Sequence, residues 1–157
     1  MKVKNEVTIE KNVTDVWQVL GNEFDQIHVW ASFFKDSKPA GEKKFHPINF
    51  SARDTVVDGK ESTHSLDVFN AEDHLFSYTV TAGAPPFTDK AQAQWVLESK
   101  NNERCTVSIT VHMELKEIIP KEKALEIKGW LSKSGDGMLE ELKHYLETGK
   151  VHPRKTN

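Results

Sequence analysis

The sequence predicts an α+β fold: a curved antiparallel sheet of about six or seven strands wrapped around one long C-terminal helix. Apolar residues recur with period two through most of the chain. They recur with helical spacing just after the first ten residues and again after Pro120. A long sheet with one apolar face must be covered, and only the C-terminal segment is long enough to cover it.

The first thirty residues predict a strand followed by two short helices. Residues 3–9 alternate in the manner of a half-buried strand, and Asn12 offers a helix cap. We expect Gly21 to end the first helix in the left-handed conformation, and residues 24–27 to form a second short helix. Such a break would let the two helices form a V that supports the sheet, with Trp17 and Phe24 both pointing inward and Trp30 beginning the next strand.

The next ninety residues predict antiparallel strands. Residues 31–37 predict an edge strand, and residues 38–47 form a polar loop. A hairpin is predicted over residues 48–69, with Asp58–Gly59 as its turn. Three further strands are predicted over residues 75–81, 91–99 and 104–115. One face of this sheet is apolar and the other polar.

Residues 121–147 predict one long helix. Gly135 and Gly137 are expected to soften its middle. We assign residues 1–149 to a single domain and residues 150–157 to a basic C-terminal tail that is frayed and solvated. The apolar side of the helix is expected to comprise Leu125, Leu131, Met138, Leu142, Tyr145 and Leu146.

Composition excludes several classes of function. A net charge of −3 with 29% charged residues gives no general affinity for nucleic acid. No run of eighteen apolar residues is present, so we expect no stable membrane insertion. The N-terminus lacks the apolar stretch of a signal peptide, and the single cysteine, Cys105, reads as a buried inert thiol. We therefore expect a cytoplasmic protein. The sequence leaves undecided whether it forms a homodimer.

No motif for metal, dinucleotide or nucleophile chemistry is found. The seven histidines are scattered, without the spacing of metal ligands, so we expect no metal and no cofactor. The G-x-G within residues 134–141 follows no predicted strand, which argues against a dinucleotide site. No G-x-S-x-G elbow is present either.

Strand parity suggests a set of cavity-lining side chains. If Val107 and Ile109 face a cavity, the same face carries Tyr78, Trp95 and His64. The full set of expected ligand-binding residues is Trp30, Arg53, His64, Tyr78, Phe87, Trp95, Val107, Ile109, Met138 and Leu142.

The chemistry of this set allows a functional and a structural interpretation. Tyr78 and Trp95 suit a flat ligand that needs one or two hydrogen bonds, or they fill the core. His64 could hold or move a proton, and Arg53 could bind a carboxylate or enolate oxygen. The sequence leaves undecided which face of the sheet the Arg53 side chain occupies. Phe87 closes a loop that is either a tight turn or a lid over the cavity.

Five motifs follow one another along the chain: "VTIEKNVTDVWQVLGNEFDQIHVW", "ARDTVVDGKESTHSL", "LFSYTV", "QWVLES" and "GMLEELKHYLE". Their order resembles the helix-grip fold of the START and birch-pollen-allergen superfamily, also called SRPBCC. Within it the chain is similar to the polyketide cyclase/dehydrase family. The resemblance covers nearly the whole chain. One departure is His64, which aligns where many relatives place a glutamate.

The resemblance implies that a small hydrophobic or aromatic molecule, lipid- or polyketide-like, binds between the sheet and the C-terminal helix. A carrier or sensor without turnover would need only apolar walls. A polyketide cyclase or dehydratase would need an acid–base pair, for which His64, Tyr78 and Arg53 are the catalytic candidates. A co-chaperone-like interaction domain would use the outer sheet face. No second proton-transfer group is predicted near His64, so we favour binding.

Overall fold

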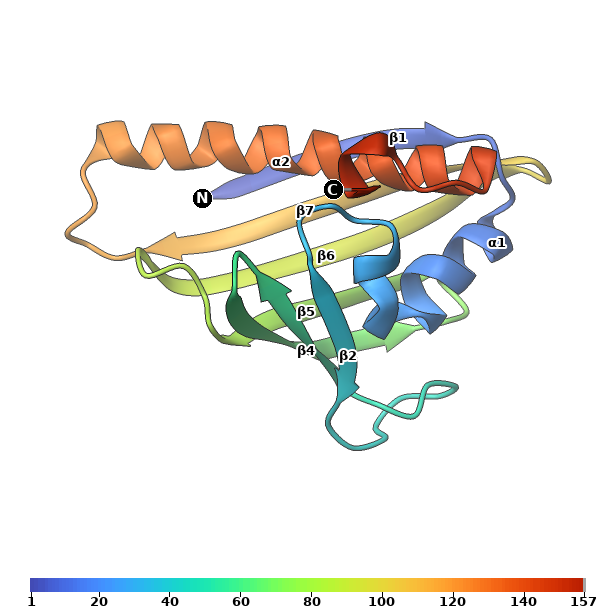
Figure 1. Ribbon diagram of the computed structural model, residues 1–157, viewed down its shortest axis with the longest axis horizontal. Coiled ribbons are helices and arrows are strands. Elements are labelled where there is room, and N and C mark those ends of the chain that lie inside the picture. Colours follow the sequence, from blue (N-terminus) through green and yellow to red (C-terminus); the bar gives the residue numbers. More distant parts are fainter. Residues whose placement is uncertain (157) are drawn as a thin grey trace.

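The computed structural model describes residues 1–156 as one seven-stranded antiparallel sheet with a long helix packed along it. This architecture confirms the predicted fold class. Figure 1 shows α2 lying along the sheet, with the short helices at the end where α2 terminates. The elements in chain order are β1 (Lys2–Ile9), α1 (Val13–Trp17), η1 (Gln18–Asn22), η2 (Phe24–Val29), β2 (Asp36–Ala40), β3 (Ala52–Val57), β4 (Lys60–Asn70), β5 (Leu75–Ala82), β6 (Thr88–Asn101), β7 (Arg104–Leu115), α2 (Lys121–Thr148) and η3 (Pro153–Thr156).

The sheet joins the first strand of the chain to the last. Its order is β1-β7-β6-β5-β4-β3-β2, so β2 to β7 form a run of successive antiparallel neighbours and β1 is added beside β7. The β1–β7 pairing runs from Lys2 opposite His112 to Ile9 opposite Cys105. Asp58 and Gly59 turn the chain between β3 and β4 with φ of 49° and 75°, which confirms the predicted hairpin.

The entry to the sheet is a bent helical segment rather than two regular helices. The Asn12 side chain accepts a hydrogen bond from the Asp15 N–H at 2.9 Å and so caps α1. α1 then widens into the π-helical η1, and the chain turns at Glu23 (φ −103°, ψ 35°) into the 3₁₀-helical η2. The predicted break is confirmed. The predicted left-handed Gly21 is wrong, because its φ is not positive and the turn is made by Glu23.

A close approach explains the glycine at position 21. A Cβ atom there would lie 2.5 Å from Cε2 of Trp17, so the indole occupies the place of a side chain. Trp17 and Phe24 are both buried, as predicted. Trp30 does not begin a strand; it ends η2, and β2 begins only at Asp36, so the strand predicted from residue 31 is also wrong.

α2 is fixed to β1 by a polar contact at its middle. Asn5 Nδ2 donates to the Ser132 carbonyl at 2.9 Å and to Asp136 Oδ1 at 2.7 Å. A Cβ at Gly135 would lie 2.4 Å from Asn5 Oδ1, so this glycine permits a close approach. The buried side of α2 includes Ile127, Leu139 and Leu142. The prediction that Leu125 lies on that side is wrong, because Leu125 is 71% exposed.

The C-terminal tail is ordered against the rest of the fold. η3 folds back along α2 (Figure 1). Arg154 Nε donates to Glu141 Oε2 at 2.9 Å, and Lys155 Nζ donates to the Phe34 carbonyl at 2.6 Å. The expectation of a frayed, solvated tail is therefore wrong for its described residues.

The core confirms the prediction that Cys105 is a buried thiol. Cys105 is fully buried, and burial raises the pKa of its thiol to about 11, as expected for an inert cysteine. Within residues 1–156, no helix combines the length and the apolarity that crossing a bilayer requires.

Candidate functional site

A pocket with a volume of about 600 Å³ lies between the inner face of the sheet and α2. Strands β3 to β7 form one wall, α2 forms another, and residues 32–34 and 83–86 complete the rim. The pocket is not enclosed but opens to solvent. Its walls are mainly apolar, with Ala91, Ala93, Ile109, Met113 and Met138 among the lining residues.

The pocket exists because small residues occupy one half of the inner face. Along β6 the inward residues are Ala91, Ala93, Trp95 and Leu97, so two small side chains are followed by two large ones. α2 contributes three further small residues to the lining of the pocket, Ser134, Gly135 and Gly137. Small residues in the lining leave room that bulky side chains fill at the other end of the sheet.

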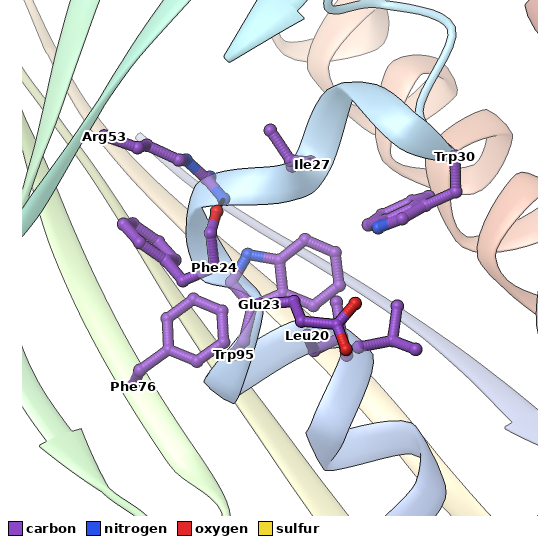
Figure 2. Close-up of a pocket in the computed structure, with 9 residues that line it drawn as sticks. Leu20, Glu23, Phe24, Ile27, Trp30, Arg53, Phe76 and Trp95 are labelled. Carbon is purple, nitrogen blue, oxygen red and sulfur yellow. Dashed lines mark hydrogen bonds between the residues drawn. The ribbon is translucent and has the colours of Figure 1, made fainter. Parts of the chain in front are cut away.

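The filled end of the sheet is shown in Figure 2. Phe24, Phe76, Trp95 and Trp30 converge there with the side chain of Arg53, which reaches in from β3. The gap between them has no room for a water molecule. Trp30, Trp95, Val107 and Leu142 are all buried in this core and do not line the pocket.

The other sequence-predicted residues lie nearer the pocket. His64, Tyr78, Ile109 and Met138 line it. Arg53 lies behind His64. The structure shows which face of the sheet Arg53 occupies: it pairs directly opposite His64, and both side chains point inward. Phe87 is half-buried beside Ala91 and Met113 and does not line the pocket, although residues 83–86 of its loop do.

Arg53 is a buried cation that forms no ion pair with a carboxylate of residues 1–156. Its Nε donates to His64 Nδ1 at 3.0 Å, and its Nη1 donates to the Phe24 carbonyl at 2.9 Å. Its Cζ lies 3.9 Å from the ring centroid of Phe24 and 5.0 Å from that of Tyr78. Nη2 has no hydrogen-bond partner among the described residues. Burial is the main cause that lowers the pKa of Arg53 to about 10, so it stays protonated at neutral pH.

His64 is held in one protonation state by this neighbour. Burial, and after it the positive charge of Arg53, lower the pKa of His64 well below its ordinary 6.5. The imidazole is therefore neutral at pH 7. Because a guanidinium can only donate, His64 Nδ1 is the acceptor and Nε2 carries the proton. The imidazole ring also contacts Tyr78 edge-on, with ring centroids 4.5 Å apart.

Glu141 is a pocket residue that the sequence analysis missed. Its carboxylate accepts hydrogen bonds from the Ser32 N–H at 2.9 Å, from the Ser32 hydroxyl and from Arg154 Nε. It is only 3% exposed. Its position three residues after Met138 places it on the inner helical face, and this spacing was the available signal. Glu141 thus connects α2 to the segment at residues 32–34 and to the tail.

Two aromatic rings stand at the rim of the pocket. Phe33 is 42% exposed and Trp130 is 44% exposed, and their ring centroids lie 6.3 Å apart. Both line the pocket. Among residues 1–156, no group of three or more His, Cys, Asp or Glu side chains is arranged to hold a metal ion.

An antiparallel sheet with a long helix across an apolar pocket defines a helix-grip protein. The chain belongs to the family described as polyketide cyclase/dehydrase and lipid transport, which it matches over residues 1–147. This match confirms the resemblance seen in the sequence. No curated protein matches the sequence.

Solved structures agree with this fold at low sequence identity. A START superfamily protein from Mycobacterium smegmatis is 11% identical with a TM-score of 0.76, over 95% of this chain and 99% of that one. The ZhuI aromatase/cyclase from Streptomyces sp. R1128 is 16% identical with a TM-score of 0.71, over 97% and 99%. The protein XoxI from Bacillus cereus is 18% identical with a TM-score of 0.72, over 96% and 99%. At these identities the likeness concerns the fold alone.

Proposed function

We propose that this protein binds a small hydrophobic or aromatic molecule, lipid- or polyketide-like, in the pocket between the sheet and α2. The observation that carries the proposal is the pocket of about 600 Å³ with predominantly apolar walls. This volume falls within the range of roughly 300–1,000 Å³ that is common for small-molecule sites. The lipid-transport description of the family supports the same kind of ligand.

The polar groups of the pocket favour binding over turnover. His64 is neutral, and its Nδ1 already accepts a hydrogen bond from Arg53, so it is suited to donate rather than to take a proton. The carboxylate of Glu141 is occupied by three hydrogen bonds from Ser32 and Arg154. Neither group is free to act as the general base that a cyclase or dehydratase would need.

The outer face of the sheet gives little support to an interaction domain. Of the large apolar side chains that are exposed among the described residues, only Val68 lies in a strand. A docking surface on the sheet would require a contiguous apolar patch. We therefore retain ligand binding as the single proposal.

Native mass spectrometry of protein purified from its own host tests this function directly. We expect a fraction of the protein to retain a small molecule that is released on denaturation. Protein that carries no such molecule, and that also fails to bind N-phenyl-1-naphthylamine, an uncharged hydrophobic probe, would contradict the proposal.

A matched pair of variants places the ligand in this pocket. Ala93→Phe adds a ring to the pocket wall, whereas Gln94→Phe adds the same ring one residue on, where the side chain is exposed. We expect Ala93→Phe to weaken binding of N-phenyl-1-naphthylamine at least tenfold, and Gln94→Phe to leave it unchanged. Equal binding by both variants would place the probe elsewhere.

Tryptophan emission supplies an independent readout. Trp130 lines the pocket, whereas Trp95 lies in the packed core, so Trp130 is the expected reporter. Titration with the probe should quench the wild type and Trp95→Phe alike, and should quench Trp130→Phe less. If only Trp95→Phe lost the response, the probe would bind next to Trp95 in the core rather than in the pocket.

A further inference from the structure

We propose that the ligand of this pocket is an apolar molecule with an ionised carboxylate, which accepts a hydrogen bond from His64 Nε2 while Arg53 acts behind His64 as a positioning residue. This inference rests on the proposed function and deepens it. It begins from a positive charge behind the wall of the pocket that forms no ion pair with any described residue.

The charge on Arg53 is not neutralised by the protein around it. No ion pair within 4.0 Å involves Arg53 in the part of the chain that the structure describes, and Asp25 attracts it only from farther away. Its surroundings include one carbonyl, one imidazole nitrogen and the aromatic faces of Phe24, Phe34 and Tyr78. The polar hydroxyl of Tyr78 also favours the charge, but it is not a carboxylate. A buried cation that lacks a partner is costly, so an anion nearby is favoured.

His64 connects this charge to the pocket. Arg53 is 2% exposed and does not line the pocket, so a ligand cannot reach the guanidinium directly. His64 lies in the lining, and its Nδ1 is taken by Arg53 Nε at 3.0 Å. Among the described residues the His64 ring makes its hydrogen bond at Nδ1 and none at Nε2, and Nε2 is not one of the fully buried atoms that lack a partner, so it is accessible from the pocket. A hydrogen bond received from a cation polarises the imidazole and makes the Nε2–H a stronger donor.

The remaining walls define the rest of the ligand. The rings of Phe34 and Tyr78 contact His64, and Val80 pairs with it on β5. Ala93, Ile109 and Val111 add apolar wall, which suits an apolar body, while Lys60 and Ser62 of β4 add polar groups to the lining. Glu141 is the buried carboxylate of the lining, and it is already paired with Arg154. An anionic group at His64 would therefore meet one donor backed by a positive charge, and an otherwise apolar chain or ring would fill the space beyond it.

The first test compares a charged ligand with its neutral twin. Decanoate and methyl decanoate have the same chain and differ mainly in charge, and their affinities can be measured by displacement of N-phenyl-1-naphthylamine at pH 8. We expect decanoate to bind at least tenfold more tightly than the ester. Equal affinities, or displacement by the ester alone, would overturn the inference and leave the proposed function standing. If the probe itself does not bind, the proposed function fails and this inference with it.

Two variants assign the preference to the Arg53–His64 pair. His64→Gln can accept from Arg53 through its carbonyl and donate through its amide, so we expect it to keep most of the acid-to-ester ratio. The double variant Arg53→Met with His64→Leu removes the charge and its partner together and leaves no orphaned donor. We expect its acid-to-ester ratio to fall to about one. A double variant that retains the wild-type ratio would overturn the inference.

Nuclear magnetic resonance tests the same contact without any substitution. In ¹⁵N-labelled wild type, His64 should show a protonated Nε2 and an unprotonated Nδ1, and decanoate should shift the Nε2–H proton downfield. A structural role alone would leave this resonance unmoved. A proton on Nδ1, or no shift on saturation with decanoate, would contradict the assignment.

Discussion

Gly21 is a position where a β-carbon would collide with a neighbouring side chain. The ring of Trp17 lies where a side chain at position 21 would begin, with Cε2 of Trp17 2.5 Å from an ideal Cβ. We expect Gly21→Ala to destabilise the protein by about 1–3 kcal/mol, because the buried indole must move. Urea denaturation measures this change.

A second glycine provides the matched control. Gly129 lies in the interior of α2, and an added Cβ there meets nothing within 4 Å. Gly129→Ala should stabilise the protein by up to about 1 kcal/mol through helix propensity. If Gly21→Ala were as stable as wild type, the contact with Trp17 would not be what requires glycine.

His64 makes stability depend on pH in a known direction. Its pKa in the folded protein is lowered well below 6.5, so below pH 6.5 the unfolded chain binds a proton that the folded chain does not. The stability of the wild type should therefore fall as the pH drops, by up to about 1.4 kcal/mol per pH unit from this group.

Comparison with His64→Gln isolates this effect, since glutamine does not titrate. Urea unfolding at pH 7.5 and 5.5 should show that the wild type loses about 1 kcal/mol more than the variant. Equal losses would mean that the folded protein accepts a proton at His64, contrary to its burial beside Arg53.

At the scale of elements, α2 organises two segments through one buried carboxylate. Glu141 binds both the N–H and the hydroxyl of Ser32, and it pairs with Arg154 of the tail. Glu141→Gln keeps the shape but removes the charge and replaces one acceptor with a donor. We expect a loss of about 1.5–3 kcal/mol in the free energy of unfolding.

Hydrogen exchange gives this prediction its local readout. The Ser32 amide should exchange faster in Glu141→Gln, whereas the amide of Ile109, in the middle of β7, should be affected only through global stability. Glu140→Gln is the control, because Glu140 lies one residue away and its side chain is 61% exposed. An unchanged Ser32 amide would show that Glu141 does not hold this segment.

The elements differed in how well periodicity could locate them. Strands β3 to β7 and α2 were predictable because each buries one face, and burial imposes a period of two or 3.6. β2 was misplaced by several residues, because its edge position leaves Lys38 and Pro39 exposed and weakens the alternation. The tail was misjudged because its order depends on Glu141 and Phe34, which are distant in the sequence.

The position of the pocket could be predicted only in part for a similar reason. The sequence showed which face of the sheet is apolar, but the end with the open space depends on what stands opposite each residue. The alanines of β6 line the pocket together with small residues of α2, whereas Trp95 of the same strand is enclosed by Phe76 and other core residues. Arg53 is similar: its orientation follows from its pairing with His64, which one strand alone does not reveal.

At the scale of the whole molecule, the sheet order predicts the sequence of folding events. β2 to β7 can form by successive local pairings, but β1 must wait for β7, since Ile9 pairs with Cys105. Closing so long a loop costs entropy before any contact compensates for it. In pulse-labelled refolding we expect the amides of β5 and β6 to gain protection before those of β1. Simultaneous or earlier protection of β1 would contradict this order.

The same strand order has a consequence during synthesis. Of the seven strands, β1 is made before the others and pairs last, so a nascent chain carries β1 without its partner until about a hundred further residues have been made. Along that edge the outward side chains are Lys2, Lys4 and Glu6, all exposed in the finished fold. Charges of this kind discourage pairing with another chain, so β1 is protected from aggregation while it waits for its own partner.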